Sequence, residues 1–338
     1  MSSADTLAVG ALRGAPAAAQ PWRLWKTGVA AAALWAVVGA VTLRWPNVEV
    51  GFTSWGYTRE FGVATLVLAA VLLLAAVAGG ARRRPVRALH RAGPWLLALA
   101  VAVGLWEIAT AKLALLPSPF FAPPQSLIEV YASDYKRLAD SLANSLWLLA
   151  NGFGLGAAGF LTGVAIGWSR GLGYWVHPVL RFLGPVPSTA LLPMAFFFFP
   201  SSWSAAVFLI ALATWFPVTV LTWSGVAGVN RAYYDVARTM GASEWFLVLR
   251  VAIPAALPQV FVGLFMGLGA SFSVLVAAEM MGVKSGLGWY LSWAQGWASY
   301  ANMYGALIVM ALVFSGLITL LFAGRDRLLA WQKGVVKW

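Results

Sequence analysis

Residues 230–254 read NRAYYDVARTMGASEWFLVLRVAIP and lie between two long apolar stretches. The pattern predicts a short helix that stops at Gly241 and a second helix capped by Ser243, because glycine adopts positive φ readily and a serine hydroxyl accepts from free N–H groups at a helix start. We expect Asp235 in the first helical turn, where a carboxylate suits the helix dipole, and Pro254 at the start of the next membrane helix. The stretch therefore predicts a compact helical elbow, a shape suited to docking a soluble partner.

The composition around this elbow is that of an integral membrane protein. Of the 338 residues, 61% are hydrophobic and 10% are charged, whereas soluble domains carry about 25% charged residues. The formal net charge of +12 is explained by Arg and Lys in cytoplasmic loops, which makes a nucleic-acid partner unnecessary. The chain contains no Cys, which excludes disulfides, thiol catalysis and thiolate metal sites.

Uncharged runs predict an all-α protein with about eight membrane spans, since a helix needs about 20 apolar residues to cross a bilayer. Residues 1–26 read as a tail, 44–60 as a polar loop and 82–91 as a basic loop that contains His90. A longer loop ends in the charged patch 134–140, and His177 falls in another short basic loop. The expected spans are 27–43, 61–81, 95–111, one within 141–169, two within 182–230 with a turn near Pro200, 251–278 and 304–323.

The distribution of basic residues predicts the orientation. If the N-terminus is cytoplasmic, 17 of the 23 Lys and Arg residues fall on the cytoplasmic side. The positive-inside rule then places both termini in the cytoplasm of a multi-pass inner-membrane protein.

Glycine patterns give one packing prediction and one false motif. Gly159, Gly163 and Gly167 have the small-xxx-small spacing that lets membrane helices approach closely, and Gly263 and Gly267 repeat it. Residues 154–159 fit GxGxxG, but they lie in an uncharged span without the strand that a dinucleotide fingerprint requires. No GxxxxGK[ST] occurs in the chain, so it carries no P-loop of its own.

The elbow resembles the EAA loop of binding-protein-dependent ABC permeases, whose pattern is roughly E-A-A-x-x-x-G-x9-I-x-L-P. Asp235, Val236 and Ala237 stand at its first three positions, Gly241 at the glycine, and 251–254 at the end. The spacing is kept, and the departures are conservative in size or charge. Residues 181–193 and 278–288 resemble the nitrate/sulfonate/taurine branch of the same family.

The resemblance covers roughly residues 95–325 and implies a type I ABC importer permease of six helices. The two extra N-terminal spans depart from that pattern, and residues 196–200 lack the glycine that the family tends to have there. The implied domains are a tail (1–26), an extra two-helix segment (27–91) and the permease domain (92–338), with a coupling loop at 227–253.

The resemblance also implies a transporter subunit that is not an enzyme and binds no cofactor. A separate cytoplasmic ABC ATPase dimer would use ATP, a second permease copy or homologue would complete the pore within the lipid bilayer, and an extracytoplasmic binding protein would deliver the solute. That solute could be nitrate, a sulfonate or a taurine-like anion. The residues implied in coupling to the ATPase are Asp235, Ala237, Arg238, Gly241 and Pro254, and Arg238 could pair with an acidic group of the partner.

Polar residues within the spans suggest a path for the solute. Ionisable groups in a membrane span are functional candidates by default. Glu279 either lines the path or pairs with Lys284, and structural pairing with Lys112 is favoured for Glu107. The residues predicted for the translocation path are Glu279, Pro187 and Ser188, and an interfacial aromatic belt is expected from Trp289, Tyr290, Trp293, Trp297 and Tyr300.

Two other functions compete with the importer. A secondary transporter driven by an ion gradient usually shows inverted repeats and paired charges at mid-membrane, and neither is visible in the sequence. A membrane-embedded enzyme needs a convergent polar cluster, and Ser, His and Asp are scarce and scattered here. The sequence predicts no catalytic residue and no metal site.

Overall fold

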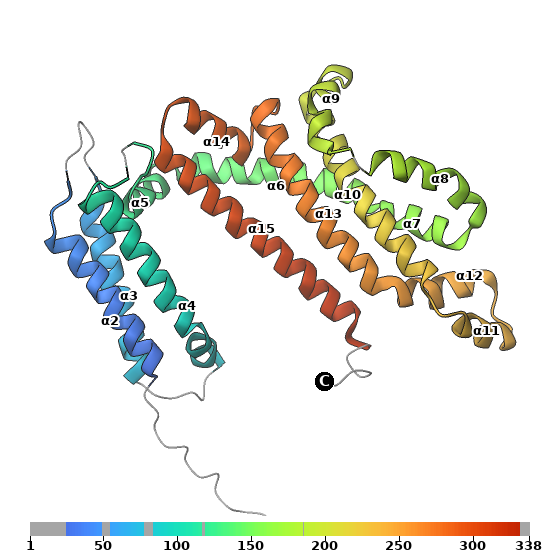
Figure 1. Cartoon of the computed structure of the whole chain (residues 1–338), viewed down its shortest axis with the longest axis horizontal. Coiled ribbons are helices and arrows are strands. Elements are labelled where there is room, and N and C mark those ends of the chain that lie inside the picture. Colours follow the sequence, from blue (N-terminus) through green and yellow to red (C-terminus); the bar gives the residue numbers. More distant parts are fainter. Residues whose placement is uncertain (1–24, 49–54, 78–83, 117–118, 185, 332–338) are drawn as a thin grey trace, which may run out of the picture. The chain divides into compact units, whose positions relative to one another are not determined.

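The structure is a computed structural model that describes residues 25–48, 55–77, 84–116, 119–184 and 186–331. All regular secondary structure within these ranges is helical (Figure 1). The chain divides into two compact units, Met1–Ile128 and Glu129–Trp338, which we describe one at a time. Most of the predicted tail lies outside the described residues, and the predicted domain boundary at residues 91/92 stays a prediction.

The first unit is built from α2 (Lys26–Arg44), α3 (Thr58–Val77) and α4 (Arg84–Glu107), which continues as a π-helical turn, Ile108–Lys112. Trp35 is buried in its core, and the indole N–H donates to the Leu96 carbonyl at 3.2 Å. The prediction of a loop at 82–91 is wrong from Arg84 onward, because α4 has already begun there. His90 therefore lies on a helix, where its ring stacks on Trp25 at 4.5 Å.

The second unit is arranged around α10 (Ser202–Ala227), which lies between α7 (Gly159–Trp168) and α13 (Ile253–Met281) in Figure 1. Helix α6 (Tyr135–Ala157) also packs on α10, and α15 (Tyr300–Leu328) completes the long helices of this unit. The fully buried residues of α10 include Leu209, Ile210 and Val218. Helix α10 is apolar on all sides, as expected for a helix that is buried on several sides.

Glycines allow the close packing on α10, as predicted. A Cβ on Gly163 would lie 2.7 Å from the Thr219 carbonyl oxygen, and one on Gly159 would lie 2.6 Å from that of Trp215. Gly263 faces α10 from the α13 side, and a Cβ there would lie 3.1 Å from the carbonyl oxygen of residue 217. Residues 154–157 lie in α6, Ala158 joins α6 to α7, and Gly159 begins α7, which agrees with their rejection as a nucleotide motif.

The fifth predicted span begins before the expected range 182–230. Helix α8 (Arg170–Leu183) begins at residue 170, and a bend of 82° separates it from the segment Ser188–Phe198. That segment consists of a 3-10 turn (Ser188–Leu191) and α9 (Leu192–Phe198). Pro187 sits at this bend in an extended conformation, φ −63° and ψ 121°, which breaks the helix. His177 lies on α8 and not in a loop, with its ring 4.3 Å from that of Trp223.

The long loop before residue 141 also contains more helix than expected. Helix α5 (Pro124–Ser133) lies within it, and α6 begins at Tyr135, so the charged patch 134–140 extends a membrane helix. The other short helix, α14 (Leu287–Gly296), joins α13 to α15. Within the described ranges seven helices are long and apolar enough to cross a membrane, or eight if α8 and α9 form one broken span. The fold is therefore that of a multi-pass membrane protein.

Candidate functional site

The elbow forms the helix-stop-helix structure that its sequence predicts. Helix α11 (Arg231–Thr239) begins after Asn230, whose side-chain oxygen accepts from the Ala232 N–H at 3.0 Å. The second helix begins as α12 (Glu244–Phe246), with the Ser243 hydroxyl accepting from the Phe246 N–H at 3.3 Å. Both helix starts thus have the side-chain caps that stabilise free N–H groups.

Gly241 ends α11 in a Schellman motif. Its φ is +81°, its N–H donates to the Arg238 carbonyl at 2.9 Å, and the Ala242 N–H donates to the Ala237 carbonyl at 3.1 Å. No atom lies within 4 Å of the position where a Cβ would stand. Glycine is therefore needed at residue 241 for its backbone conformation and not for lack of space.

Two details of the elbow differ from the expectations, those of Asp235 and Arg238, and Pro254 agrees with them. Asp235 is the fifth residue of α11 and lies in its second turn. Pro254 is the second residue of α13, as predicted, although the helical path is continuous from Glu244 to Met281. A π-helical segment, Leu247–Ala252, joins α12 to α13 and ends two residues before the proline. Arg238 pairs within the elbow, its guanidinium donating to the Glu244 carboxylate at 3.2 Å.

One face of the elbow exposes apolar side chains. Tyr233, Val236 and Met240 follow one another at helical spacing and are 62%, 62% and 83% exposed. Trp245, at the start of the second helix, is 76% exposed, and no residue of α11 is buried. Isolated exposed apolar residues are ordinary, but a contiguous set on a surface helix marks an interaction site.

The opposite side of α11 attaches the elbow to the membrane helices. The Tyr234 ring packs edge-on against Trp168 of α7, with centroids 5.6 Å apart, and contacts the cluster of Val226, Ala252 and Ala256. Burial raises the pKa of the Tyr234 phenol above its usual value. The elbow is thus fixed to α7, α10 and α13, so a force on its exposed face acts on these helices.

A concave surface lies beside the bend of the fifth span and encloses a pocket of about 350 Å³. The bent segment, α10 and α13 all contribute to its lining, which contains the hydroxyls of Ser188, Thr189 and Ser273 and no charged side chain. Of the predicted path residues, Ser188 lines this surface, Pro187 is its neighbour in the chain, and Glu279 lies elsewhere. The structure does not bring the three together in one cavity.

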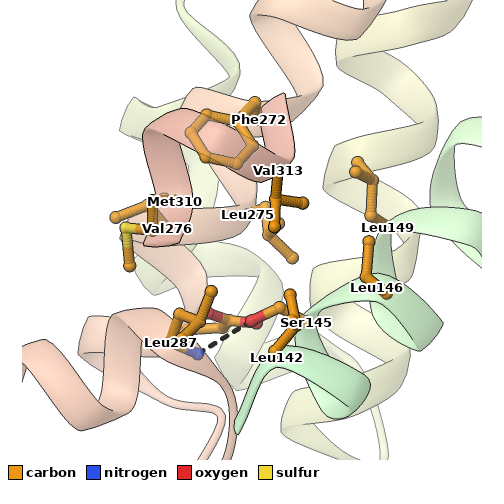
Figure 2. A pocket seen from close by; sticks show the side chains of 11 residues that line it. Leu142, Ser145, Leu146, Leu149, Phe272, Leu275, Val276, Leu287, Met310 and Val313 are labelled. Carbon is orange, nitrogen blue, oxygen red and sulfur yellow. Dashed lines mark hydrogen bonds between the residues drawn. The ribbon is translucent and has the colours of Figure 1, made fainter. Parts of the chain in front are cut away.

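Glu279 is buried at the end of α13 and hydrogen-bonded to its surroundings. The Ser145 hydroxyl donates to one carboxylate oxygen at 2.7 Å, and the Gly288 N–H donates to the other at 2.7 Å. Glu279 lines a small void of about 10 Å³, and the other side chains that line this void are almost all apolar (Figure 2). The alternative pairing with Lys284 is wrong, because no ion pair between the two is present in this part of the chain.

A second polar network joins α14 to the starts of α6 and α15. The Tyr290 phenol donates to the Asp134 carboxylate at 2.7 Å and accepts from the Asn302 amide at 2.8 Å. Burial and then the Asp134 carboxylate raise the pKa of Tyr290. Tyr290 is fully buried and is not part of an exposed belt, whereas Trp297 is 74% exposed. Sequence reasoning missed Ser145 and Asp134, because nothing local signals a contact with a residue so distant in the chain.

In the first unit, Lys112 forms the predicted ion pair with Glu107, with the ammonium nitrogen 3.6 Å from a carboxylate oxygen. The Lys112 ammonium also donates to the carbonyls of Thr42 and Trp45 at 3.0 and 2.6 Å and to the Asn47 side chain at 2.6 Å. Lys112 thereby holds the C-terminal end of α2, where free carbonyls favour a cation. Within the described ranges, no three His, Asp or Glu side chains gather where they could hold a metal ion.

Comparison with known proteins connects this geometry to a family. Residues 154–332 match the family described as binding-protein-dependent transport system inner membrane component. A probable ABC transporter permease protein of Brucella abortus is 30% identical over 70% of this chain and 95% of its own length. A protein of Bacillus subtilis, provisionally named as an aliphatic sulfonates transport permease, is 29% identical over 69% of this chain and 85% of its own length.

A third relative is the nitrate import permease protein of Synechococcus elongatus, 28% identical over 70% of this chain and 87% of its own length. These relatives are named as transporter subunits and not as enzymes. The matched region contains the elbow, α10, α13 and the bent fifth span. The chain belongs to the family of binding-protein-dependent transport system inner membrane components, the permease subunits of ABC importers.

Proposed function

We propose that this chain is the translocating permease of an ATP-driven importer and that its elbow docks on a cytoplasmic ABC ATPase dimer. The observation that carries the proposal is an exposed apolar face. It is formed by Tyr233 and Val236 of α11, a helix with no buried residue, and by Met240 directly after the helix. Full burial of each such side chain contributes roughly 1.5–3 kcal/mol. A groove on the ATPase that covers this face would hold the two proteins together.

The coupling residues act in different ways in this proposal. Gly241 and Ala237 shape the Schellman turn, and the Arg238–Glu244 pair fixes the second helix against the first. Asp235 faces the partner as a free carboxylate, and Pro254 lies where the elbow enters the membrane helix. Closure of the ATPase dimer on ATP would move the elbow, and the elbow would rock α7, α10 and α13 between two states.

Co-purification with the ATPase subunit tests the docking. Gly241→Val opposes the positive φ that the turn needs, and the branched side chain makes this conformation costly. Gly241→Asn is the matched control, because asparagine tolerates the left-handed region. We expect at least about tenfold less co-purified ATPase with the Val variant and a near-normal amount with the Asn variant, since a tenfold change corresponds to about 1.4 kcal/mol. Met240→Asp, which changes only the exposed surface, should also reduce the amount.

The main alternative is transport driven by an ion gradient. If the wild-type chain purifies without an ATPase and still transports in proteoliposomes under an ion gradient alone, the importer proposal is wrong. If uptake requires ATP on the elbow side of the membrane and is indifferent to the gradient, the alternative is excluded.

The proposed solute is a small oxyanion, such as nitrate or an organosulfonate. Two relatives are named for aliphatic sulfonates and for nitrate, which supports this class. The concave surface beside Ser188 offers hydroxyls and no charge, so it can pass an anion with little selectivity of its own. An extracytoplasmic binding protein would supply the specificity, and a second permease copy or homologue would close the path on its open side.

Uptake by the reconstituted complex tests the solute. Nitrate and taurine are compared as labelled substrates, each with the candidate binding protein present. Ser188→Ala removes a hydroxyl from the concave surface and should lower the uptake rate a few-fold, while the co-purified ATPase stays unchanged. An uptake rate unaffected by Ser188→Ala and by Thr189→Val would remove this surface from the path.

A further inference from the structure

Helix α14 begins without a cap of its own. Its N-cap residue is Gly286, which has no side chain to accept from the first N–H groups of the helix. Buried N–H groups at a helix start need acceptors, because an unpaired buried donor costs about 1–3 kcal/mol. Leu287, the first residue of α14, and Gly288 are both buried, so water does not fill this role.

Two other helices supply the missing acceptors. The Leu287 N–H donates to the Ser145 hydroxyl of α6 at 2.8 Å, a bond drawn as a dashed line in Figure 2. The Gly288 N–H donates to the Glu279 carboxylate of α13 at 2.7 Å, and Ser145 donates to the same carboxylate. Glu279 is only 1% exposed, and its carboxylate sits at the positive end of the α14 dipole.

The backbone around the carboxylate leaves no space for further side chains. Gly286 has a φ of +99°, and a Cβ at that position would overlap the Glu279 carboxylate. A Cβ at Gly288 would lie 2.7 Å from the Val276 carbonyl and 2.8 Å from the Glu279 Cβ. The two glycines therefore let the start of α14 close directly onto α13.

Glu279 also lies at a special place along its own helix. The helical path from Glu244 to Met281 is continuous over 38 residues, which corresponds to about 57 Å. The elbow forms one end of this path, and Glu279 lies within one turn of the other end. A movement of the elbow would thus reach the residue that holds α14 along one helix.

We propose that Glu279 is a positioning residue that makes α14 move together with α13 when the elbow moves. The inference rests on the proposed ATPase coupling. It assigns Glu279 and α14 as the elements that respond at the end of α13 far from the elbow. The surrounding contacts are apolar, and apolar contacts have little directional preference, so they permit α14 to slide against α13. The two hydrogen bonds that the Glu279 carboxyl group accepts have fixed geometry and prevent this sliding.

Spin labels at the two ends of the path test the inference, since the chain has no Cys of its own. One label is placed at Leu249→Cys, near the elbow, and the other at Trp297→Cys, at the end of α14, and both side chains are more than half exposed. The complete complex with its ATPase is studied in nanodiscs before and after addition of ATP and vanadate. In the wild-type background both labels should change their spectra.

Glu279→Leu removes the acceptors at similar size, and Glu279→Gln keeps one acceptor. We expect the response at residue 297 to fall severalfold in Glu279→Leu and less in Glu279→Gln, with the response at residue 249 retained. Lys284→Gln, which changes an exposed charge near Glu279, should leave both responses as in wild type. If Glu279→Leu does not fold, Glu279→Gln and Ser145→Ala decide the question.

The outcomes separate this inference from the proposed function. Equal responses of both labels in every variant would overturn the role of Glu279 and leave the ATPase coupling intact. If neither label responds in the wild-type background, the coupling itself is wrong and the inference falls with it.

Discussion

Tyr290 shows, at the scale of one residue, how burial changes the meaning of an aromatic side chain. Its sequence neighbourhood is rich in Trp and Tyr and predicts an interfacial belt. The structure buries the ring fully, and the phenol donates to Asp134 at 2.7 Å. A hydrogen bond to a charged acceptor contributes roughly 1.5–3 kcal/mol when its donor is buried.

This contact predicts a specific pH dependence. The pKa of Tyr290 is raised in the folded protein, so its contribution is complete below the unfolded value of about 10 and is lost as pH rises toward the folded value. Tyr290→Phe should unfold at lower denaturant concentration at pH 7 and lose less additional stability above a pH of about 10 than wild type. Unfolding in detergent on both sides of that pH measures both effects. If wild type and Tyr290→Phe lost the same amount of stability at high pH, the pH dependence would not come from Tyr290.

At the scale of the element, glycine decides how closely α6 can approach α10. A Cβ on Gly156 would lie 2.6 Å from the Ala211 carbonyl, whereas one on Gly154, on the same helix, would meet nothing within 4 Å. A backbone carbonyl cannot turn aside as a side chain can, so the helices would have to separate. Spacing alone did not show that Gly156 shares this packing with Gly159 and Gly163.

A matched pair of variants tests this packing. Gly156→Ala should destabilise the protein by about 1–3 kcal/mol through overpacking. Gly154→Ala should be neutral or stabilise it by about 0.5–1 kcal/mol, because alanine favours a helix more than glycine does. Thermal unfolding of the purified protein in detergent compares the two. A similar change in both variants would mean that the α6–α10 contact does not limit stability.

At the scale of the whole molecule, the count of spans and the basic residues predict the orientation. Within the described ranges, seven long helices and one bent pair place both termini on one side if the pair crosses the membrane. The positive-inside rule predicts that this side is the cytoplasm. Whether the number of spans is odd or even depends on the bent pair of α8 and α9. Topology mapping therefore tests both the bent span and the positive-inside rule.

Single cysteines can map this topology because the natural chain has none. An impermeant maleimide applied to intact spheroplasts should label Lys284→Cys and should not label Ser2→Cys or Lys337→Cys. Permeabilised cells serve as the control, in which all three must react. Labelling of only one terminus in intact spheroplasts would show that α8 and α9 do not together cross the membrane.

The sequence by itself determined the membrane class, the approximate spans and the elbow, because each depends on local composition. A run of apolar residues, a cap at Ser243 and a glycine at 241 act through their immediate neighbours in the chain. The family followed from the same local spacing. The error at Asp235 concerns a helix start, because Asn230 caps α11 and the helix begins at Arg231.

Tertiary structure alone decided the contacts between distant segments. The joining of Ser145 to Glu279 and of Asp134 to Tyr290 spans 134 and 156 residues, and no local pattern encodes such pairs. The buried Glu279 carboxylate accepts a backbone N–H of α14 because that helix starts at a glycine that cannot cap it. Which polar residue holds a helix and which lines a path therefore depends on the packing of α6, α13 and α14, where burial makes an unpaired polar group costly.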